Sequence, residues 1–503
     1  MVLAVPLAYT TDVRFAHAAW RIATVISGLA LFFSLLQLRW CRGTLLVAVY
    51  GGLLLITVEA VIATQQLLRP LSAWVPMYSG RIYGTFFQPN VLASFLATGI
   101  ALSLALLLLP SLALSQPRYE RLRQASLHLL LLGLSALLVC IQSRAGWLGG
   151  VAATLILLRF GRLNTLRTTA AIAAVVAGVI LGASWLYSGQ SLLPLTDHTF
   201  SNQARWTMLR DTLAMIADKP WLGWGYGGFE YDFQHFRLNQ SPPVSIVEIA
   251  RHPHNEILFW VVEGGLITLV GVILILYGLW TLVRQAIRRD RLALASDGRL
   301  AGVPTALCII ALPMAIHTQL EFPFYLSTLH FVVFLLLLAA ADRLSEGAIH
   351  SHPLPTGCHP LLPGVMAAMA LSIALLAGFA IRGQQVLREV ESFAMEDVTP
   401  LKTLPPLSRL ILQERITFDE QVGGLMRYNH TQDEYLLEDY RDWAQDYLQR
   451  RIDKNVYASL IQVLHHQKQH DTAGRYRREA ALLFPQDARF ASAAETEPGG
   501  YGG

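Results

Sequence analysis

Long apolar segments recur along this chain and restrict the folds that it can adopt. A helix that crosses a bilayer needs about 20 apolar residues, and within the bilayer only helices and closed barrels satisfy their own backbone hydrogen bonds. Candidate spanning segments lie at 20–37, 44–63, 91–110, 126–141, 146–160, 168–186, 257–282, 301–318, 324–341 and 361–382. The sequence therefore predicts an all-α, polytopic membrane protein with about 10 to 12 transmembrane helices.

Composition agrees with this class and excludes others. Charged residues make up 15% of the 503 residues, whereas soluble domains carry about 25%. The net charge is only +4, and the arginines are spread over many short loops, so we expect no nucleic-acid partner. The four cysteines show neither metal-ligand spacing nor a disulfide framework. We therefore expect no metal and no cofactor.

The basic loops predict the orientation. Cytoplasmic loops of membrane proteins are rich in Lys and Arg, and alternate loops of this chain are basic, at 38–43, 111–125, 159–167 and 283–300. The opposite face then holds 64–90, 142–145, a long loop at about 187–256, 319–323 and the chain after 382. We expect a multi-pass protein of the bacterial inner membrane whose second face lies in the periplasm.

Two domains follow from the change in composition near residue 382. Residues 1–382 are predicted to form the transmembrane domain, including the long loop at about 187–256. Residues 383–503 carry more charge and show helical periodicity with a resemblance to tetratricopeptide repeats. They are predicted to form a periplasmic α-helical domain.

The segment His252-Pro253-His254-Asn255 stands where the apolar run at 257–282 begins. Proline suits the first position of a helix, which would place His254 in the first turn. The positive end of a helix disfavours protonation of an imidazole and attracts anions. The sequence thus predicts His254 as a neutral general base; the alternative is an ordinary interfacial histidine.

Four arginines on the same predicted face are candidate anion ligands. Arg144 lies in a short turn between two apolar segments, where a cation is costly unless it is paired; it is predicted to contact phosphate, and the alternative is an arginine that snorkels to water. Arg205 and Arg210 belong to a predicted amphipathic helix at 201–217, whose apolar face would comprise Trp206, Leu209, Leu213 and Ile216. The alternative interpretation is that Arg205 and Arg210 lie on a solvated face of this helix. Arg81 lies near another span end.

Polar side chains at neighbouring boundaries are candidate positioning residues. Gln88 and Asn90 flank Pro89 at a predicted helix start, where they could equally be a plain cap. His317 and Glu321 are four residues apart and would share a helix face, either to bind a sugar or as a structural pair. His252 and Asn255 complete the set.

Two further patterns have competing interpretations. Glycines alternate with aromatic residues at 220–229, which would let the backbone approach a ligand while the rings stack on sugars; the alternative is an aromatic membrane-interface belt. Glu230 and Asp232 form an acidic pair, for which we expect a solvated loop and no metal.

These motifs resemble the Wzy/WaaL superfamily of membrane glycan ligases and polymerases. Ser143-Arg144-x-Gly146-Trp147 and the loop that ends in His252-Pro253-His254-Asn255-x-x-Leu258 are similar to its shared core. Two more segments resemble the PglL-type O-oligosaccharyltransferases, namely Gly84-Thr85-Phe86-x-Gln88-Pro89-Asn90 and His317-x-x-x-Glu321-Phe322-Pro323, the latter followed by a helical tail. The resemblance covers most of residues 80–345.

The resemblance implies a GT-C-like, metal-independent glycosyltransferase that uses an undecaprenyl-pyrophosphate-linked glycan as donor. For the PglL-type branch it implies protein O-glycosylation of a Ser or Thr hydroxyl of a periplasmic protein such as a pilin. An O-antigen ligase or polymerase, acting on the lipid A core or on a glycan, is the alternative. A transporter or flippase ranks lower, because the polar residues gather at one face and not at mid-membrane.

The resemblance also implies roles for the motif residues. His254 would activate the acceptor hydroxyl. Arg144 and Arg205, supported by Arg81 or Arg210, would neutralise the pyrophosphate. The remaining residues would position the substrates: Gln88, Asn90, His252, Asn255, His317 and Glu321.

Overall fold

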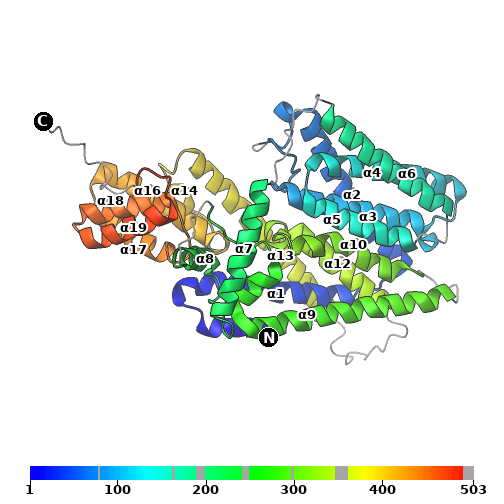
Figure 1. Ribbon diagram of the computed structural model, residues 1–503, viewed down its shortest axis with the longest axis horizontal. Coiled ribbons are helices and arrows are strands. Elements are labelled where there is room, and N and C mark those ends of the chain that lie inside the picture. The colour runs from blue at the N-terminus through cyan, green and yellow to red at the C-terminus, as the bar shows by residue number, and fades with distance from the viewer. Residues whose placement is uncertain are drawn as a thin grey trace. The chain divides into compact units, whose positions relative to one another are not determined.

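The computed structural model describes residues 1–77, 80–160, 165–188, 199–240, 248–295, 300–345 and 361–490, and these residues form helices and turns without a strand. Each predicted spanning segment is helical (Figure 1): α1 (Asp12–Leu36), α2 (Arg42–Leu68), α3 (Pro89–Leu108), α4 (Pro117–Ile141), α5 (Arg144–Phe160), α6 (Thr165–Tyr187), α9 (Glu256–Ala295), α10 (Val303–Thr318), α11 (Pro323–Leu326) with α12 (Thr328–Ser345), and α13 (Leu361–Ser392). The all-α prediction is confirmed.

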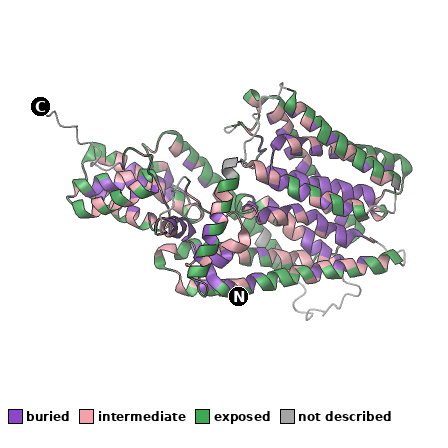
Figure 2. Ribbon diagram, viewed as in Figure 1, coloured by how far each residue is buried: buried purple, intermediate pink, exposed green. Residues whose placement is uncertain are grey.

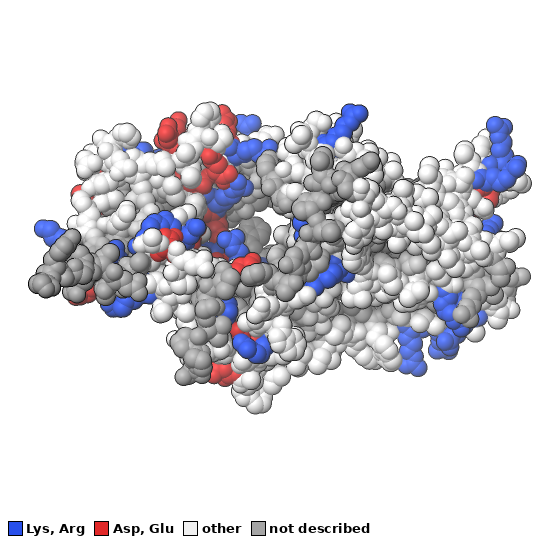
Figure 3. All heavy atoms as spheres, turned by 45° about the horizontal axis from the view of Figure 1, so that its top comes forward, with Lys and Arg blue, Asp and Glu red and all other residues white. Residues whose placement is uncertain are grey.

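The apolar helices make this a polytopic membrane protein. Among the described residues, 7 helices are long and apolar enough to cross a membrane, and α10 is a shorter apolar helix. Large apolar side chains on their outer sides, such as Leu129, Val151 and Ile273, are exposed, which in water would be unfavourable but in lipid is not. Figure 3 shows a broad surface over these helices that is nearly free of charged side chains, with Lys and Arg gathered at its edges.

The chain forms two compact units. The membrane unit comprises Met1–Tyr9, His17–Gly225 and His252–Ile349, and the C-terminal unit comprises Thr10–Ala16, Tyr226–Arg251 and His350–Gly503. Part of the long loop at 187–256 thus belongs to the C-terminal unit. The same loop contains α7 (Thr199–Asp218), which agrees with the amphipathic helix predicted at 201–217, and α8 (Phe229–Leu238), which the sequence analysis did not anticipate.

The core of the membrane unit lies along α3, which is buried from Val91 to Leu108 (Figure 2). This helix packs against α2, α4, α5, α6 and α10. Small residues allow these backbones to approach: a Cβ on Gly146 of α5 would lie 2.5 Å from the Cβ of Ala93 in α3, and one on Gly149 would lie 2.8 Å from Pro313 in α10. The start of α3 and the start of α5 are therefore held side by side.

The C-terminal unit contains short helices followed by helical hairpins. These are α14 (Thr399–Lys402), α15 (Pro406–Ile411), α16 (Gln413–Thr431), α17 (Glu434–Tyr447), α18 (Lys454–His466) and α19 (His470–Leu483). Helices α16, α17 and α18 each pack on the next helix in the chain, and Tyr440, Tyr457 and Leu460 are buried between the last four helices. This agrees with the helical periodicity of the tail.

The acidic pair on α8 corrects a prediction. Glu230 and Asp232 do not lie in a solvated loop; both are buried in the C-terminal unit. Glu230 accepts hydrogen bonds from Arg451 at 2.9 Å and from the backbone N–H of Ile452 at 2.9 Å, while Asp232 pairs with Arg14 at 2.8 Å. Their partners lie more than 200 residues away in the chain, which is why the local sequence gave no sign of them.

Candidate active site

Helix ends place the predicted polar residues at one end of the membrane unit. Helix α3 begins at Pro89 as predicted, and its N-cap Gln88 accepts a hydrogen bond from the backbone N–H of Asn90 at 2.9 Å. Asn255 caps α9 by accepting from the N–H of Leu258 at 2.9 Å, and its side-chain amide donates to the carbonyl of Gln319 at 3.2 Å. The start of α9 is thereby tied to the segment that follows α10.

Glu321, just after α10, is the centre of the candidate site. Its carboxylate accepts hydrogen bonds from Gln88 Nε2 at 3.2 Å, Arg205 Nη2 at 2.6 Å and His317 Nε2 at 3.3 Å, and from the side-chain amide of Asn90. The Glu321 side chain is only 4% exposed. Tertiary folding thus brings four of the predicted site residues onto one carboxylate.

These donors keep Glu321 ionised. Burial by itself opposes ionisation of a carboxyl group, but the hydrogen bond from His317 and the positive charge of Arg205 outweigh it, so the pKa of Glu321 lies below its usual value. A buried carboxylate that accepts several hydrogen bonds and faces a guanidinium is a stable anion. It holds Arg205 in place until another anion competes for that guanidinium.

His254 lies next to this cluster but not inside α9, which corrects the predicted helix start. The helix begins at Glu256, because Asn255 takes the capping position. His254 therefore precedes the helix with φ +56°, a left-handed conformation. Its backbone N–H donates to His252 Nδ1 at 3.0 Å, so His252 supports the turn that presents His254.

The imidazole of His254 is neutral for a reason other than the predicted one. Burial lowers its pKa to about 4; the negative charge of Glu321 opposes this shift, and the positive charge of Arg205 adds to it. Burial disfavours the charged form of any imidazole. Its buried Nδ1 has no hydrogen-bond partner among the described residues, and its ring contacts Phe322 with centroids 5.7 Å apart. A neutral imidazole, one nitrogen of which is buried and unpaired among the described residues, therefore lies beside Arg205 and Glu321.

Arg144 stands at the first position of α5, where the turn is fixed by its neighbours. Ser143 Oγ accepts a hydrogen bond from the N–H of Gly146 at 3.2 Å, and Trp147 Nε1 donates to the carbonyl of Leu138 at 2.8 Å. The Arg144 guanidinium donates to the side-chain carbonyl of Asn202 in α7. Its positive charge also repels that of Arg205, so an anion near both cations would relieve the repulsion.

Arg81 lies at the C-terminal end of α4. Its Nη2 donates to the carbonyl oxygens of Ile141 at 3.3 Å and Gln142 at 3.5 Å, where the helix end carries partial negative charge. Burial lowers the pKa of Arg81, and the negative charge of Glu321 opposes this shift. Arg81 thus supplies a third positive charge on the Glu321 side of the site.

Arg210 is not brought into the cluster. Its side chain is 59% exposed and pairs with the adjacent Asp211 at 2.9 Å. It follows Arg205 by five residues, so the two side chains leave α7 in different directions. On the predicted apolar face of α7, Trp206 and Leu213 are exposed, whereas Thr212 and Met215 of the same helix are buried.

A second polar cluster beside His254 was missed by the sequence analysis. Arg21 of α1 pairs with Glu263 of α9 and lies 4.0 Å from the ring centroid of Phe259 and 3.7 Å from that of Trp260. Glu256 accepts hydrogen bonds from Tyr325 at 2.9 Å and Trp260 at 2.7 Å. The sequence did contain a signal for this cluster, because Arg21 and Glu263 are ionisable residues inside apolar segments. Such residues seldom lack a partner.

The backbone of the glycine and aromatic segment packs against α9, while its ligand role and its membrane-belt role both stay predictions. Gly225 donates its backbone N–H to the carbonyl of Glu263 at 2.8 Å, and Trp224 donates to Val262 at 3.0 Å. Helix α9 is kinked at Gly265, and a Cβ on Gly223 would lie 2.5 Å from the backbone of Glu263. Gly223 has φ +70°, so glycine is needed there for the backbone conformation and for this close approach.

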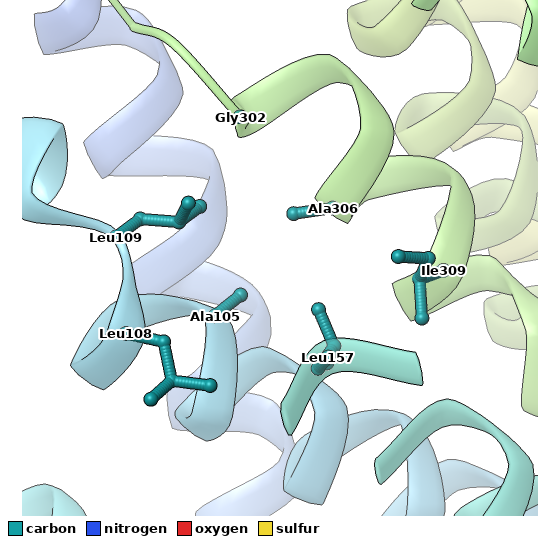
Figure 4. A pocket seen from close by; sticks show the side chains of 7 residues that line it. All are labelled: Ala105, Leu108, Leu109, Leu157, Gly302, Ala306 and Ile309. Carbon is teal, nitrogen blue, oxygen red and sulfur yellow. The ribbon is translucent and has the colours of Figure 1, made fainter. Parts of the chain in front are cut away.

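An apolar crevice occurs at the other end of α3 and α10 (Figure 4). It is lined by Leu108 and Leu109 at the end of α3, by Gly302 and Ala306 at the start of α10, and by Leu157 of α5, among others. All of its side chains are apolar, so it offers no group for catalysis. Elsewhere in the described part of the chain, no three His, Cys, Asp or Glu residues are grouped to hold a metal ion; metal independence stays a prediction.

Two family models match the chain. Residues 129–273, which contain Arg144, Arg205 and His254, match the model described as O-antigen ligase. Residues 305–497, which contain His317 and Glu321, match the C-terminal model of the virulence factor membrane-bound polymerases. No curated protein matches the chain. The two matches support the Wzy/WaaL superfamily and a multi-pass enzyme of the glycosyl-transferring ligase or polymerase type.

Proposed function

We propose that this protein transfers a preassembled oligosaccharide from undecaprenyl pyrophosphate to a Ser or Thr hydroxyl of a periplasmic protein such as a pilin. The observation that carries the proposal is the placement of the neutral His254 imidazole beside Arg205 and Glu321. A base and an anion-binding group next to each other are what transfer from a pyrophosphate to a hydroxyl requires. We place the site on the periplasmic face of the inner membrane.

The reaction is a substitution at the anomeric carbon of the glycan. His254 takes the proton of the acceptor hydroxyl, and the hydroxyl oxygen forms a bond to the anomeric carbon. The bond from that carbon to the pyrophosphate oxygen breaks, and undecaprenyl pyrophosphate leaves with the bonding electrons. No redox step or cofactor enters this balance.

The arginines stabilise the leaving group. Negative charge grows on the pyrophosphate as the bond breaks, and preorganised cations lower the free energy of that transition state. The charges of Arg144 and Arg205 repel each other, so a pyrophosphate bound near both guanidinium groups would offset that repulsion. Gln88 and Asn90 then keep Glu321 in place when the pyrophosphate competes for Arg205.

The acceptor separates two candidate functions with the same site. The family models favour an O-antigen ligase or polymerase as the second candidate, in which the hydroxyl belongs to the lipid A core or to another glycan. The segments around Gln88 and around His317 resemble the PglL-type enzymes and favour a protein acceptor. Both candidates need His254 and Arg205.

The test compares a Gram-negative host that has a lipid-linked glycan and a pilin, with and without this protein. Glycoproteomics would detect a modified pilin peptide, and analysis of lipopolysaccharide and free glycan would detect the other acceptors. His254→Ala should abolish the product. His128→Ala is the control, since His128 lies on α4 and contacts the Gln124 carbonyl. Glycan on lipid A alone would reject the protein acceptor, and full activity of His254→Ala would reject the site.

A further inference from the structure

A buried chain of side chains continues from Glu321 into the core of the membrane unit. His317 Nδ1 lies 2.8 Å from Ser94 Oγ, and Ser94 Oγ lies 3.3 Å from His330 Nε2. His317, Ser94 and His330 are each 0% exposed, and they come from α10, α3 and α12. Neither Ser94 nor His330 belongs to a motif that the sequence analysis selected.

The hydrogen positions at the inner end of this chain are determined by its neighbours. His330 Nε2 lies 3.1 Å from the carbonyl oxygen of Val91. A carbonyl oxygen can only accept, so Nε2 must carry the proton. His330 Nδ1 is then an acceptor, and the Ser327 hydroxyl 2.9 Å away donates to it. The protonated Nε2 of His330 also points its hydrogen toward Ser94 Oγ.

The outer end of the chain is determined by charge. His317 Nε2 faces the Glu321 carboxylate at 3.3 Å, which favours a proton on Nε2. Glu321 is already paired with Arg205, and a second fully buried cation would have no counter-ion of its own. With the proton on Nε2, His317 Nδ1 accepts the hydroxyl hydrogen of Ser94 at 2.8 Å, and the Val91 carbonyl, 3.1 Å from Ser94 Oγ, is the competing acceptor for that hydrogen.

We propose that Ser94 and His330 are positioning residues that hold His317 as the neutral Nε2–H tautomer, so that a hydrogen-bond donor always faces Glu321. For catalysis this rests on the proposed function, because Glu321 in turn orients Arg205 and Asn90. The chain of side chains ends on the Val91 carbonyl and the Ser327 hydroxyl, which fix the hydrogen positions of His330.

The tautomer is tested without an activity assay. The full-length protein with 15N-labelled histidine is placed in lipid nanodiscs, and solid-state NMR distinguishes Nε2–H, Nδ1–H and doubly protonated rings. His317→Gln assigns the His317 signals. We expect the Nε2–H form in the wild type and a change of the His317 signals in Ser94→Ala. A wild-type Nδ1–H tautomer, a doubly protonated ring, or signals unaffected by Ser94→Ala would overturn the proposal.

Glycan transfer then tests the positioning role. Ser94→Ala should lower kcat/KM by about 3- to 30-fold, the loss expected for one buried hydrogen bond near a charge. The matched control is Ser103→Ala: Ser103 lies on the same helix and is 0% exposed, and its hydroxyl has no hydrogen-bond partner among the residues that the structure describes. An equal fall of kcat/KM in Ser94→Ala and Ser103→Ala would mean that the packing of α3, and not the hydrogen bond of Ser94, affects transfer.

Two variants of His330 separate hydrogen bonding from packing. His330 packs against Phe86 and Phe95 with ring centroids 5.1 and 5.2 Å away. His330→Phe keeps an aromatic ring there but loses the donor, whereas His330→Gln keeps an amide donor and acceptor. We expect kcat/KM of glycan transfer to fall in His330→Phe and to be partly retained in His330→Gln. A higher kcat/KM in His330→Phe than in His330→Gln would contradict the role of the hydrogen-bond donor.

A double variant shows whether Ser94 acts through His317. Ser94→Ala should have no further effect in a His317→Ala background, because contacting residues in one network are not additive. Fully additive losses would overturn the proposal. If wild-type protein transferred no glycan but showed the Nε2–H signal and its response to Ser94→Ala, the proposed function would fail while the tautomer network would stand.

Discussion

Arg205 and Glu321 form an ion pair with an N–O distance of 2.6 Å although 116 residues separate them in the chain. Arg205 lies on α7, and Glu321 follows α10. The Glu321 side chain is 4% exposed and that of Arg205 28% exposed, so the guanidinium is held from the protein side and remains accessible to an anion from outside. This pair is the basis of the first two predictions.

Arg205→Ala should lower glycan transfer by about 10²- to 10³-fold, the usual effect of removing one group that stabilises transition-state charge. Arg210→Ala on the same helix should stay within about twofold, because exposed ion pairs contribute little. The measurement is kcat/KM with purified protein and a lipid-linked donor. An equal fall of kcat/KM in both variants would show that only the total positive charge of α7 affects transfer, and not the position of Arg205.

Glu321→Gln should lower both transfer and stability. The neutral amide leaves Arg205 without its counter-ion and faces several donors with a donor of its own, which should cost about 1–3 kcal/mol. Glu120→Gln is the contrasting variant: Glu120 pairs with Arg123 at 2.6 Å on α4, so it should lower the unfolding temperature but not transfer. Transfer lost equally in both would refute a specific role for Glu321.

The pH dependence follows from the lowered pKa of His254, about 4 in the folded protein against 6.5 for an ordinary histidine. Activity that depends on the neutral base should persist below pH 6.5 and fall as the pH approaches 4. An activity limb near pH 6.5 would contradict a buried, neutral His254.

The lowered pKa of His254 also makes the free energy of unfolding depend on pH. Between pH 6.5 and 4 the unfolded chain binds a proton at His254 that the folded chain does not, so this group makes the protein less stable as the pH falls through that window. Thermal unfolding of wild type and His254→Gln at pH 7, 6, 5 and 4 measures the difference. The variant should lose less stability than wild type over this range.

Gly146→Ala should destabilise the membrane unit, because its Cβ would lie 2.5 Å from the Cβ of Ala93 and force α5 away from α3. We expect a cost of about 1–3 kcal/mol, as for other overpacked sites. Gly133→Ala on α4 is the control, since among the described residues no neighbour beyond its own helix backbone lies within 4 Å of its Cβ, and helix propensity alone favours alanine. A higher unfolding temperature for Gly146→Ala would show that the close packing of α3 and α5 is incorrect.

Glu230→Ala should unfold the C-terminal unit more readily, because it leaves Arg451 without one of its carboxylate partners; breaking a buried pair costs about 3–5 kcal/mol. Glu434→Ala is the matched control, with a side chain that is 58% exposed in its pair with His466. Hydrogen exchange of α18 and α19 provides the measurement. Equal protection in the two variants would disprove the structural role of Glu230.

The apolar helices of this protein could be predicted from local sequence, whereas α8 could not. Apolar length defines the spanning helices, and Pro89 after Gln88 marks the start of α3, because a cap depends on neighbours within a few residues. The candidate residues Gln88, Asn90, Arg205, His317 and Glu321 could be predicted as well, since ionisable groups and amides at span ends need partners. None of these signals states which partner each residue has.

Tertiary structure decided what those residues do together. It made Glu321 the common hydrogen-bond acceptor and left Arg210 outside the cluster. It buried Thr212 and Met215 of α7 while Trp206 stayed exposed, and it placed Asn255 rather than Pro253 at the start of α9. The physical reason is the range of the interactions. Helix formation and capping act within a few residues, whereas the burial of His254 and the pairing of Arg205 depend on side chains that only the folded chain brings into contact.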